Sequence, residues 1–326
     1  MAVGNGLRSG GQILVDQLRI HEVDTIFCVP GESYLTVIDA LHDAQNEIKT
    51  VACRQEGGAT NMAEAYGKLT GKPGVAMVTR GPGACNGSIG VHTAMQDSTP
   101  MVIFIGQVAR DQEYREAFQE VDYHQFYGAI CKEVVQIDHA ERVPELVSQA
   151  FHIAASGRPG PVAVSIPEDM QRDMADVADA RAFTTVRSEV GPKAMADFRA
   201  QLANSERPLM ILGGAGWSEK ACTDIQAFSE ANAVPVAASF RCQDLFDNMH
   251  VNYAGELGTS ASPQLGERLR ASDLLIVLGS RLGEMTTNGY SLVSLPVPRQ
   301  KLVHVYMDAS ELGRVYEPDV SIVASM

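Results

Sequence analysis

Short apolar runs alternate with segments of helical spacing along the first half of the chain. The apolar runs lie at 25–29, 49–53, 75–78, 101–105 and 162–166, with the length and composition of buried strands. Between them, apolar side chains recur every three or four residues at 11–20, 33–41, 56–70, 83–97 and 143–154, which indicates amphipathic helices. Strands that alternate with helices predict a mostly parallel sheet covered on both faces.

A second series of the same kind follows a break in the pattern. Charged and small residues dominate 171–189, as in an interdomain linker. Strands are then expected at 209–212, 234–237, 274–278 and 302–306, with helices at 219–232 and 265–271. We therefore predict an α/β protein with two three-layer, parallel-sheet domains, at 1–175 and 192–326, joined by a linker at 176–191.

Composition and charge narrow the classes of protein. The 326 residues are 45% apolar and 20% charged, which is ordinary for a soluble globular chain. The net charge of −14 argues against a nucleic-acid partner, which needs a basic face. No apolar run reaches the roughly 18 residues of a membrane span, and no secretory signal opens the sequence. The six cysteines form no C-x-x-C pair, so we expect neither a disulfide framework nor a zinc site, and we expect a cytoplasmic location.

Three glycine-containing loops each follow a predicted strand. They include Pro30-Gly31, the segment around Glu56, and Gly81-Pro82-Gly83. A single acidic residue at a helix start is explained by the helix dipole alone, and a single glycine pair by a tight turn. Three such loops at the carboxyl ends of parallel strands instead predict a ligand site. The sequence has no H-E-x-x-H, no G-x-S-x-G and no Walker A lysine. It therefore lacks the minimal motifs of the corresponding hydrolases and NTPases.

These motifs resemble the pyrimidine-binding domain of thiamine-diphosphate enzymes, and most closely the acetolactate synthase large-subunit group. The resemblance rests on Pro30-Gly31, Arg54-Gln55-Glu56-Gly57, Gly81-Pro82-Gly83-Ala84-Cys85-Asn86, Ala117-Phe118-Gln119-Glu120 and Ser156-Gly157-Arg158-Pro159-Gly160-Pro161. The second half is similar to the Rossmann-like central domain of the same group at 208–216, 273–281 and 303–308.

The resemblance implies a site and an activity. A glutamate in the place of Glu56 bonds the ring nitrogen of the cofactor's aminopyrimidine, which activates thiamine diphosphate to attack a 2-oxo acid such as pyruvate, with decarboxylation and carboligation. The residues implied to contact the cofactor are Pro30, Gly31, Thr79, Gly81, Pro82, Gly83 and Asn86. Phe118, Gln119 and Lys132 would lie near the substrate. Arg158 and Arg281 correspond to flavin contacts, which makes FAD a possible second cofactor.

The chain departs from that group at several positions. Glu32 stands where a small residue is usual, and Cys85 where threonine is usual. After Arg281 the sequence is Leu-Gly-Glu-Met in place of Phe-Asp-Asp-Arg, which leaves FAD, ADP or no ligand open for the central domain.

The family also holds the diphosphate and Mg²⁺ on a third domain marked by Gly-Asp-Gly, which this sequence lacks. We therefore assign no metal ligand, and we expect the chain alone to be inactive. It would act in a homodimer or homotetramer, or with a separate diphosphate-binding chain. The alternative is a non-catalytic or regulatory nucleotide- or flavin-binding module that kept the fold.

Overall fold

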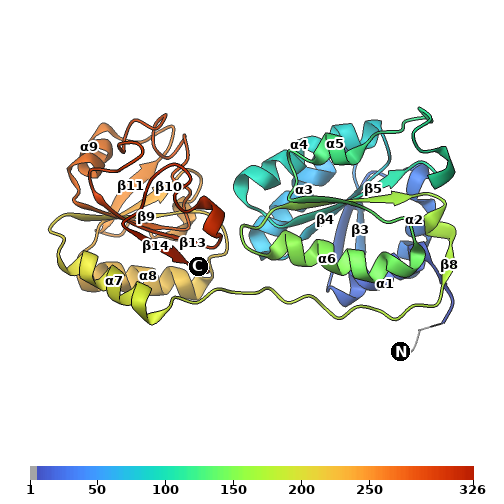
Figure 1. Ribbon diagram of the computed structural model, residues 1–326, viewed down its shortest axis with the longest axis horizontal. Coiled ribbons are helices and arrows are strands. Elements are labelled where there is room, and N and C mark those ends of the chain that lie inside the picture. The colour runs from blue at the N-terminus through green and yellow to red at the C-terminus, as the bar shows by residue number, and fades with distance from the viewer. Residues whose placement is uncertain (1–5) are drawn as a thin grey trace. The chain divides into compact units, whose positions relative to one another are not determined.

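The protein forms two compact units, each built on a six-stranded parallel sheet (Figure 1). The structure is a computed structural model, and it describes residues 6–326. The first unit extends to Val186 and the second begins at Arg187. Two parallel-sheet α/β domains are the predicted fold class, which is confirmed.

The sheet of the first unit has the strand order β3-β2-β4-β5-β7-β6. Its strands are β2 (Thr25–Cys28), β3 (Lys49–Ala52), β4 (Gly74–Val78), β5 (Met101–Gln107), β6 (Glu133–Gln136) and β7 (Pro161–Pro167). From β2 the chain passes to β3 on one side, whereas β4 pairs with the other side of β2. Open α/β sheets bind ligands at such a switch point, outside the carboxyl ends of the strands. A separate antiparallel pair joins β1 (Arg8–Ser9) to β8 (Met174–Ala175).

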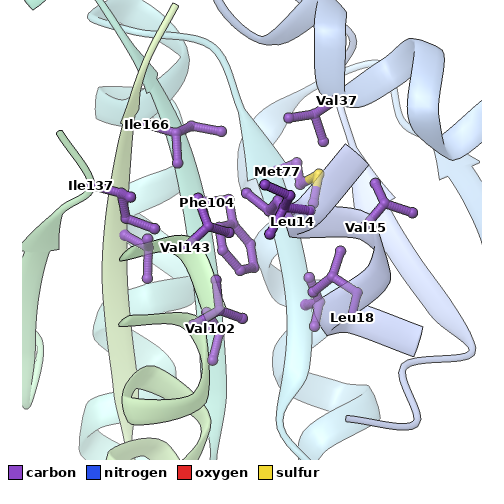
Figure 2. Close-up of a cluster of buried hydrophobic side chains, with 14 of the residues drawn as sticks. Leu14, Val15, Leu18, Val37, Met77, Val102, Phe104, Ile137, Val143 and Ile166 are labelled. Carbon is purple, nitrogen blue, oxygen red and sulfur yellow. The ribbon is translucent and has the colours of Figure 1, made fainter. Parts of the chain in front are cut away.

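Helices cover both faces of this sheet (Figure 1). One face carries α1 (Gly10–Ile20), α2 (Leu35–Asp43) and α6 (Val143–Ala155), and the other carries α3 (Glu56–Thr70), α4 (Pro82–Asp97) and α5 (Tyr123–Tyr127). Figure 2 shows the core of the first face, where Leu14 and Leu18 of α1 and Val143 of α6 lie against Met77 and Phe104 of the sheet. Burying each of these side chains contributes about 1.5–3 kcal/mol. This core therefore holds in place the carboxyl edge of the sheet, from which the loops after β2 and β4 emerge.

Capping residues define both ends of α3, and they determine where its first residue, Glu56, lies. The Gln55 side chain caps the helix by accepting from the amide of Gly58 at 2.8 Å. Gly71 closes it with a left-handed φ of 70°, a conformation that favours glycine. A Cβ on Gly90 of α4 would come within 2.4 Å of Thr60 Oγ1, so α3 and α4 pack at close range. These constraints hold Glu56 at the carboxyl edge of the sheet.

The second unit repeats the three-layer plan with the strand order β11-β10-β9-β12-β13-β14. The strands are β9 (Pro208–Leu212), β10 (Val236–Ser239), β11 (Tyr253–Leu257), β12 (Leu274–Leu278), β13 (Lys301–Tyr306) and β14 (Val320–Val323). One face carries α7 (Pro192–Ala203) and α8 (Glu219–Asn232), and the other carries α9 (Pro263–Ala271) (Figure 1). The switch point of this sheet lies between β9 and β12.

The segment expected to be a linker, 176–191, is not uniformly free of contacts. Phe183 packs near His21 and Phe151 of the first unit, and the Phe183 amide donates to His21 Nδ1 at 3.2 Å. Further along, the Ser188 amide donates to Ser325 Oγ within the second unit. An aromatic side chain buries apolar area even in a polar stretch, which is why the first part of this segment packs on the first unit.

Candidate active site

The loops that follow β2 and β4 meet at the carboxyl edge of the first sheet. Ser33, in the short helical turn η1 (Glu32–Tyr34) after β2, places its Oγ 2.8 Å from Thr79 Oγ1. The same Ser33 Oγ accepts a hydrogen bond from the Arg80 amide at 3.1 Å. The two loops are therefore locked together at the switch point of the sheet.

Glycine is required where these loops touch. A Cβ on Gly31 would lie 2.4 Å from Thr79 Cβ, and one on Gly83 would lie 2.8 Å from Thr79 Cγ2 and 3.4 Å from Glu56 Oε1. Real Cβ atoms do not approach backbone-anchored atoms to 2.4 Å, so Gly31 in particular admits no larger residue without a shift. The structure thus brings Gly31, Thr79, Gly83 and Glu56 together.

The Gly81 turn opens α4 and is held by a buried tyrosine. Gly81 has a φ of 56°, and Pro82 follows as the first residue of the helix. The Gly81 amide donates to the Tyr123 hydroxyl at 3.0 Å, and that hydroxyl lies 3.3 Å from the carbonyl of Gly106. Burial raises the pKa of Tyr123 to about 12. The hydroxyl therefore keeps its proton at neutral pH and can donate to Gly106 while it accepts from Gly81.

Glu56 is half-buried at the first position of α3. Asn86 Nδ2 donates to Glu56 Oε2 at 3.1 Å. Across residues 6–326, no donor contacts the other oxygen, Oε1, which faces Gly83. Glu56 therefore has one oxygen fixed by its neighbour and one left to meet an incoming N–H group.

Phe118 and Gln119 belong to the same edge, whereas Lys132 and Arg158 do not. A Cβ on Gly81 would come within 2.6 Å of the Gln119 carbonyl oxygen. Phe118 precedes it with a side chain that is 72% exposed.

Lys132 and Arg158 come shortly before β6 and β7, at the amino edge of the sheet. The ammonium of Lys132 donates to the carbonyls of Ile153 and Ser156 at the end of α6. Arg158 donates to Ser98 Oγ at 2.9 Å and to the Met95 carbonyl at the end of α4. In this chain both cations thus contact helix ends, and neither is grouped with Glu56.

The second unit has its own switch point, between β9 and β12, where two glycine loops meet. Gly213 and Gly214 follow β9, and Gly279 and Arg281 lie just after β12. Gly214 and Gly279 have φ values of 74° and 72°, and a Cβ on Gly214 would lie 2.0 Å from the Gly279 carbonyl oxygen. Glycine backbone at this position is typical of nucleotide-binding α/β sheets. Arg281 is half-buried two residues after Gly279.

Three charged residues near the first site were not assigned from sequence. Arg80 is only 9% exposed and pairs with Glu32 and Glu168, each at 3.0 Å. Glu32 stands out in the sequence as unusual for its position. The pairing of Glu32 with Arg80, and of Arg80 with Glu168, could not be identified there, because the three residues follow different strands and are distant along the chain. Over residues 6–326, no cluster of three or more His, Cys, Asp or Glu side chains is arranged to hold a metal ion.

Comparison with known proteins agrees with this geometry. Residues 8–126 match the family described as "Thiamine pyrophosphate enzyme, N-terminal TPP binding domain", and residues 195–326 match "Thiamine pyrophosphate enzyme, central domain". The acetolactate synthase large subunit of Parasynechococcus marenigrum is 34% identical over 98% of this chain and 52% of its own length. The isozyme 2 large subunit of Escherichia coli is 32% identical over 96% of this chain and 56% of its own length. The chain spans about half the length of the curated relatives it matches. Through these two domains, the chain belongs to the thiamine pyrophosphate enzyme family.

Proposed function

We propose that this chain supplies the pyrimidine-binding and central domains of a thiamine-diphosphate enzyme that decarboxylates a 2-oxo acid such as pyruvate and joins the product to an acceptor, as in acetolactate synthases. The observation that carries the proposal is Glu56, with its free oxygen beside Gly83 at the switch point of the first sheet. The relatives, which are acetolactate synthase large subunits, support the same reaction class.

The residues at this edge fit the aminopyrimidine end of the cofactor. A ring nitrogen needs one carboxyl oxygen in reach, and Glu56 Oε1 is the oxygen without a donor among the described residues. Gly31, Thr79, Gly81, Pro82, Gly83 and Asn86 would surround it. When bound, thiamine diphosphate supplies a nucleophilic carbon and an electron sink for decarboxylation.

Glu56 would act by holding or moving a proton at Oε1. Asn86 fixes the carboxylate through Oε2, so that rotation about the side chain does not withdraw Oε1 from its position. A positioned acid–base group of this kind contributes about 10²–10⁴-fold to a rate. The exposed ring of Phe118 would cover the edge and limit the access of water, with Gln119 beside it near the substrate.

We assign the diphosphate and Mg²⁺ to a third domain that does not belong to these 326 residues, and we propose that the chain acts in a homo-oligomer or with a separate diphosphate-binding chain. The absence of a ligand cluster in residues 6–326 supports that division. For the central domain, FAD or another nucleotide would bind at the loops of Gly214 and Gly279, near Arg281. A nucleotide-binding module without catalysis is the second candidate function, and the same glycine loops at the switch point favour it. The colour of the purified protein and any nucleotide released on denaturation test it.

We also propose a cytoplasmic location. All six cysteines are free thiols, as is usual in a reducing compartment. Within residues 6–326, no helix combines the length and the apolarity that crossing a membrane requires.

Saturation-transfer NMR with thiamine diphosphate and Mg²⁺ tests the cofactor assignment on the full chain, because the method detects weak binding. We expect transfer to the pyrimidine protons with the natural chain, and its loss with Glu56→Ala. Glu219→Ala is the matched control, since Glu219 is likewise the first residue of a helix, α8. Equal transfer in all three proteins would contradict the role of Glu56. Affinity in the nanomolar range would contradict the assignment of the diphosphate to residues outside this chain.

A further inference from the structure

One buried guanidinium joins four loops at the carboxyl edge of the first sheet. Arg80, after β4, donates from Nη2 to Glu32 Oε1 after β2 and from Nη1 to Glu168 Oε2 after β7, each at 3.0 Å. Its Nε donates to the carbonyl of Phe118, in the segment after β5, at 3.2 Å. Arg80 itself is 9% exposed. Each of its three nitrogens therefore donates to a partner on another loop.

Arginine has a geometry for this task that lysine lacks. The guanidinium is planar and presents donors in fixed directions, so it can meet two carboxylates and a carbonyl at once. A buried charge without partners is costly, so removing a partner is expected to weaken the whole arrangement. The two carboxylates differ in exposure, since the Glu32 side chain is 62% exposed and that of Glu168 is 28% exposed. Glu168 is therefore the stronger of the two partners.

The segment that Arg80 contacts, residues 113–120, has an unusual backbone. Tyr114, Glu116 and Gln119 have positive φ values of 62°, 53° and 65°. Non-glycine residues in this region of φ are strained and persist only where the surroundings hold them. The Glu120 carboxylate accepts from the amides of Tyr114 at 2.6 Å and Ala117 at 2.9 Å. The segment thus depends on a few polar contacts for its shape.

Close packing places this strained segment against the Gly81 turn. A Cβ on Gly81 would meet the Gln119 carbonyl oxygen at 2.6 Å. Arg80 is the residue before Gly81, and it also holds the carbonyl before Gln119. A change at Arg80 would therefore alter both the Gly81 turn and the segment that contains Gln119.

We propose that Arg80 is a positioning residue, held by Glu168 and Glu32, which fixes the Phe118 carbonyl and so places Phe118 and Gln119 beside the Gly81–Gly83 turn. The positioning is a property of the chain itself. Only its effect on substrate turnover rests on the proposed function.

Hydrogen exchange measured by mass spectrometry on the full chain tests the positioning directly. In Arg80→Met, we expect the amides of 114–120 to exchange about tenfold faster or more, because a hydrogen bond to a charged group is worth at least that factor in an equilibrium. Arg80→Lys and Glu168→Gln should give smaller increases. Exchange in α6 should stay unchanged in all three variants.

Arg8→Met is the matched control. Arg8 also contacts two carboxylates, those of Asp16 and Asp179, and one carbonyl, that of Val177. Its loss should leave 114–120 protected. Unchanged exchange of 114–120 in Arg80→Met would overturn the proposal. So would a rise spread evenly over the first unit, since that is the result of a general loss of stability.

Kinetics of the assembled enzyme then separate the two proposals. We expect Arg80→Lys to raise the KM for the 2-oxo acid by a larger factor than it lowers kcat, because the substrate-side loop is loosened while Glu56 is untouched. A variant with natural KM and faster exchange would overturn the link to substrate. Absence of 2-oxo acid turnover in the natural enzyme would overturn the proposed function, while the exchange result would still decide the role of Arg80.

Discussion

Ser33 Oγ lies 2.8 Å from Thr79 Oγ1, and this contact joins the two loops that flank the switch point of the first sheet. The contact forms because Gly31, two residues before Ser33, leaves room for Thr79. The geometry of the candidate site therefore depends on the absence of a side chain as much as on the groups present.

Gly31→Ala should destabilise the first unit by about 1–3 kcal/mol, the usual cost of forcing an extra carbon into a packed position. The added Cβ would meet Thr79 Cβ at 2.4 Å. Gly58→Ala is the control, because a Cβ there meets nothing within 4 Å and the residue lies in a helix, where alanine is favoured over glycine. Native-state hydrogen exchange of the β4 amides measures the stability of the first unit in both variants. Equal protection in the two variants would show that Gly31 is not packed as described.

Lys132→Met should lower the stability of α6 by about 1–2 kcal/mol, since a charged donor to two terminal carbonyls is lost. Those carbonyls belong to Ile153 and Ser156. Hydrogen exchange at the end of α6 reports the loss. Lys193→Met serves as control, because the Lys193 side chain is 89% exposed and pairs with Asp197 on its own helix. Natural stability together with an altered KM would instead favour the substrate-side role that the family resemblance implies for Lys132.

The stability of the first unit should rise with pH between about 4 and 6.5 in part because of His21. Burial, with a smaller contribution from the charge of His152, lowers the pKa of His21 to about 4. The unfolded chain keeps a histidine pKa near 6.5, so over this window the unfolded state binds the extra proton and stability falls as the pH falls. The slope from this one group reaches at most about 1.4 kcal/mol per pH unit.

His21→Phe should reduce that slope while it also removes the acceptor for the Phe183 amide. Urea unfolding at pH 4.5, 5.5 and 6.5 gives the free energy of unfolding at each pH. Its slope against pH reports the titration of His21, whereas the lost hydrogen bond lowers the free energy equally at every pH. An unchanged slope in His21→Phe would contradict the buried neutral state of His21.

The buried strands were predictable, whereas of the four edge strands in the two large sheets only β3 was predicted. The runs at β4, β5 and β7 are buried along their whole length, so their apolar sequences are continuous and easily recognised. The strands missing from the sequence prediction are mostly at sheet edges, namely β6, β11 and β14. There the burial is partial or alternating. Helix α7 was missed for the same reason, since none of its residues is fully buried.

The backbone of the site was predictable, but its ion pairs were not. Glycine at 31, 81 and 83 and the acidic residue at the start of α3 can be recognised from spacing after predicted strands. The pairing of Arg80 with Glu168 depends on β7 lying near β4 in the sheet, with β5 between them, and no local pattern encodes that order. The contacts of Lys132 and Arg158 with helix ends likewise depend on tertiary packing.

The rate of carbon dioxide release from pyruvate by the enzyme assembled with this chain tests the central claim most directly. We predict that Glu56→Ala lowers kcat by about 10²-fold or more, with the thermal unfolding midpoint unchanged and with Glu219→Ala as active as the natural chain. A Glu56→Ala enzyme that turns over pyruvate within a factor of about two of the natural rate would contradict the assignment of Glu56.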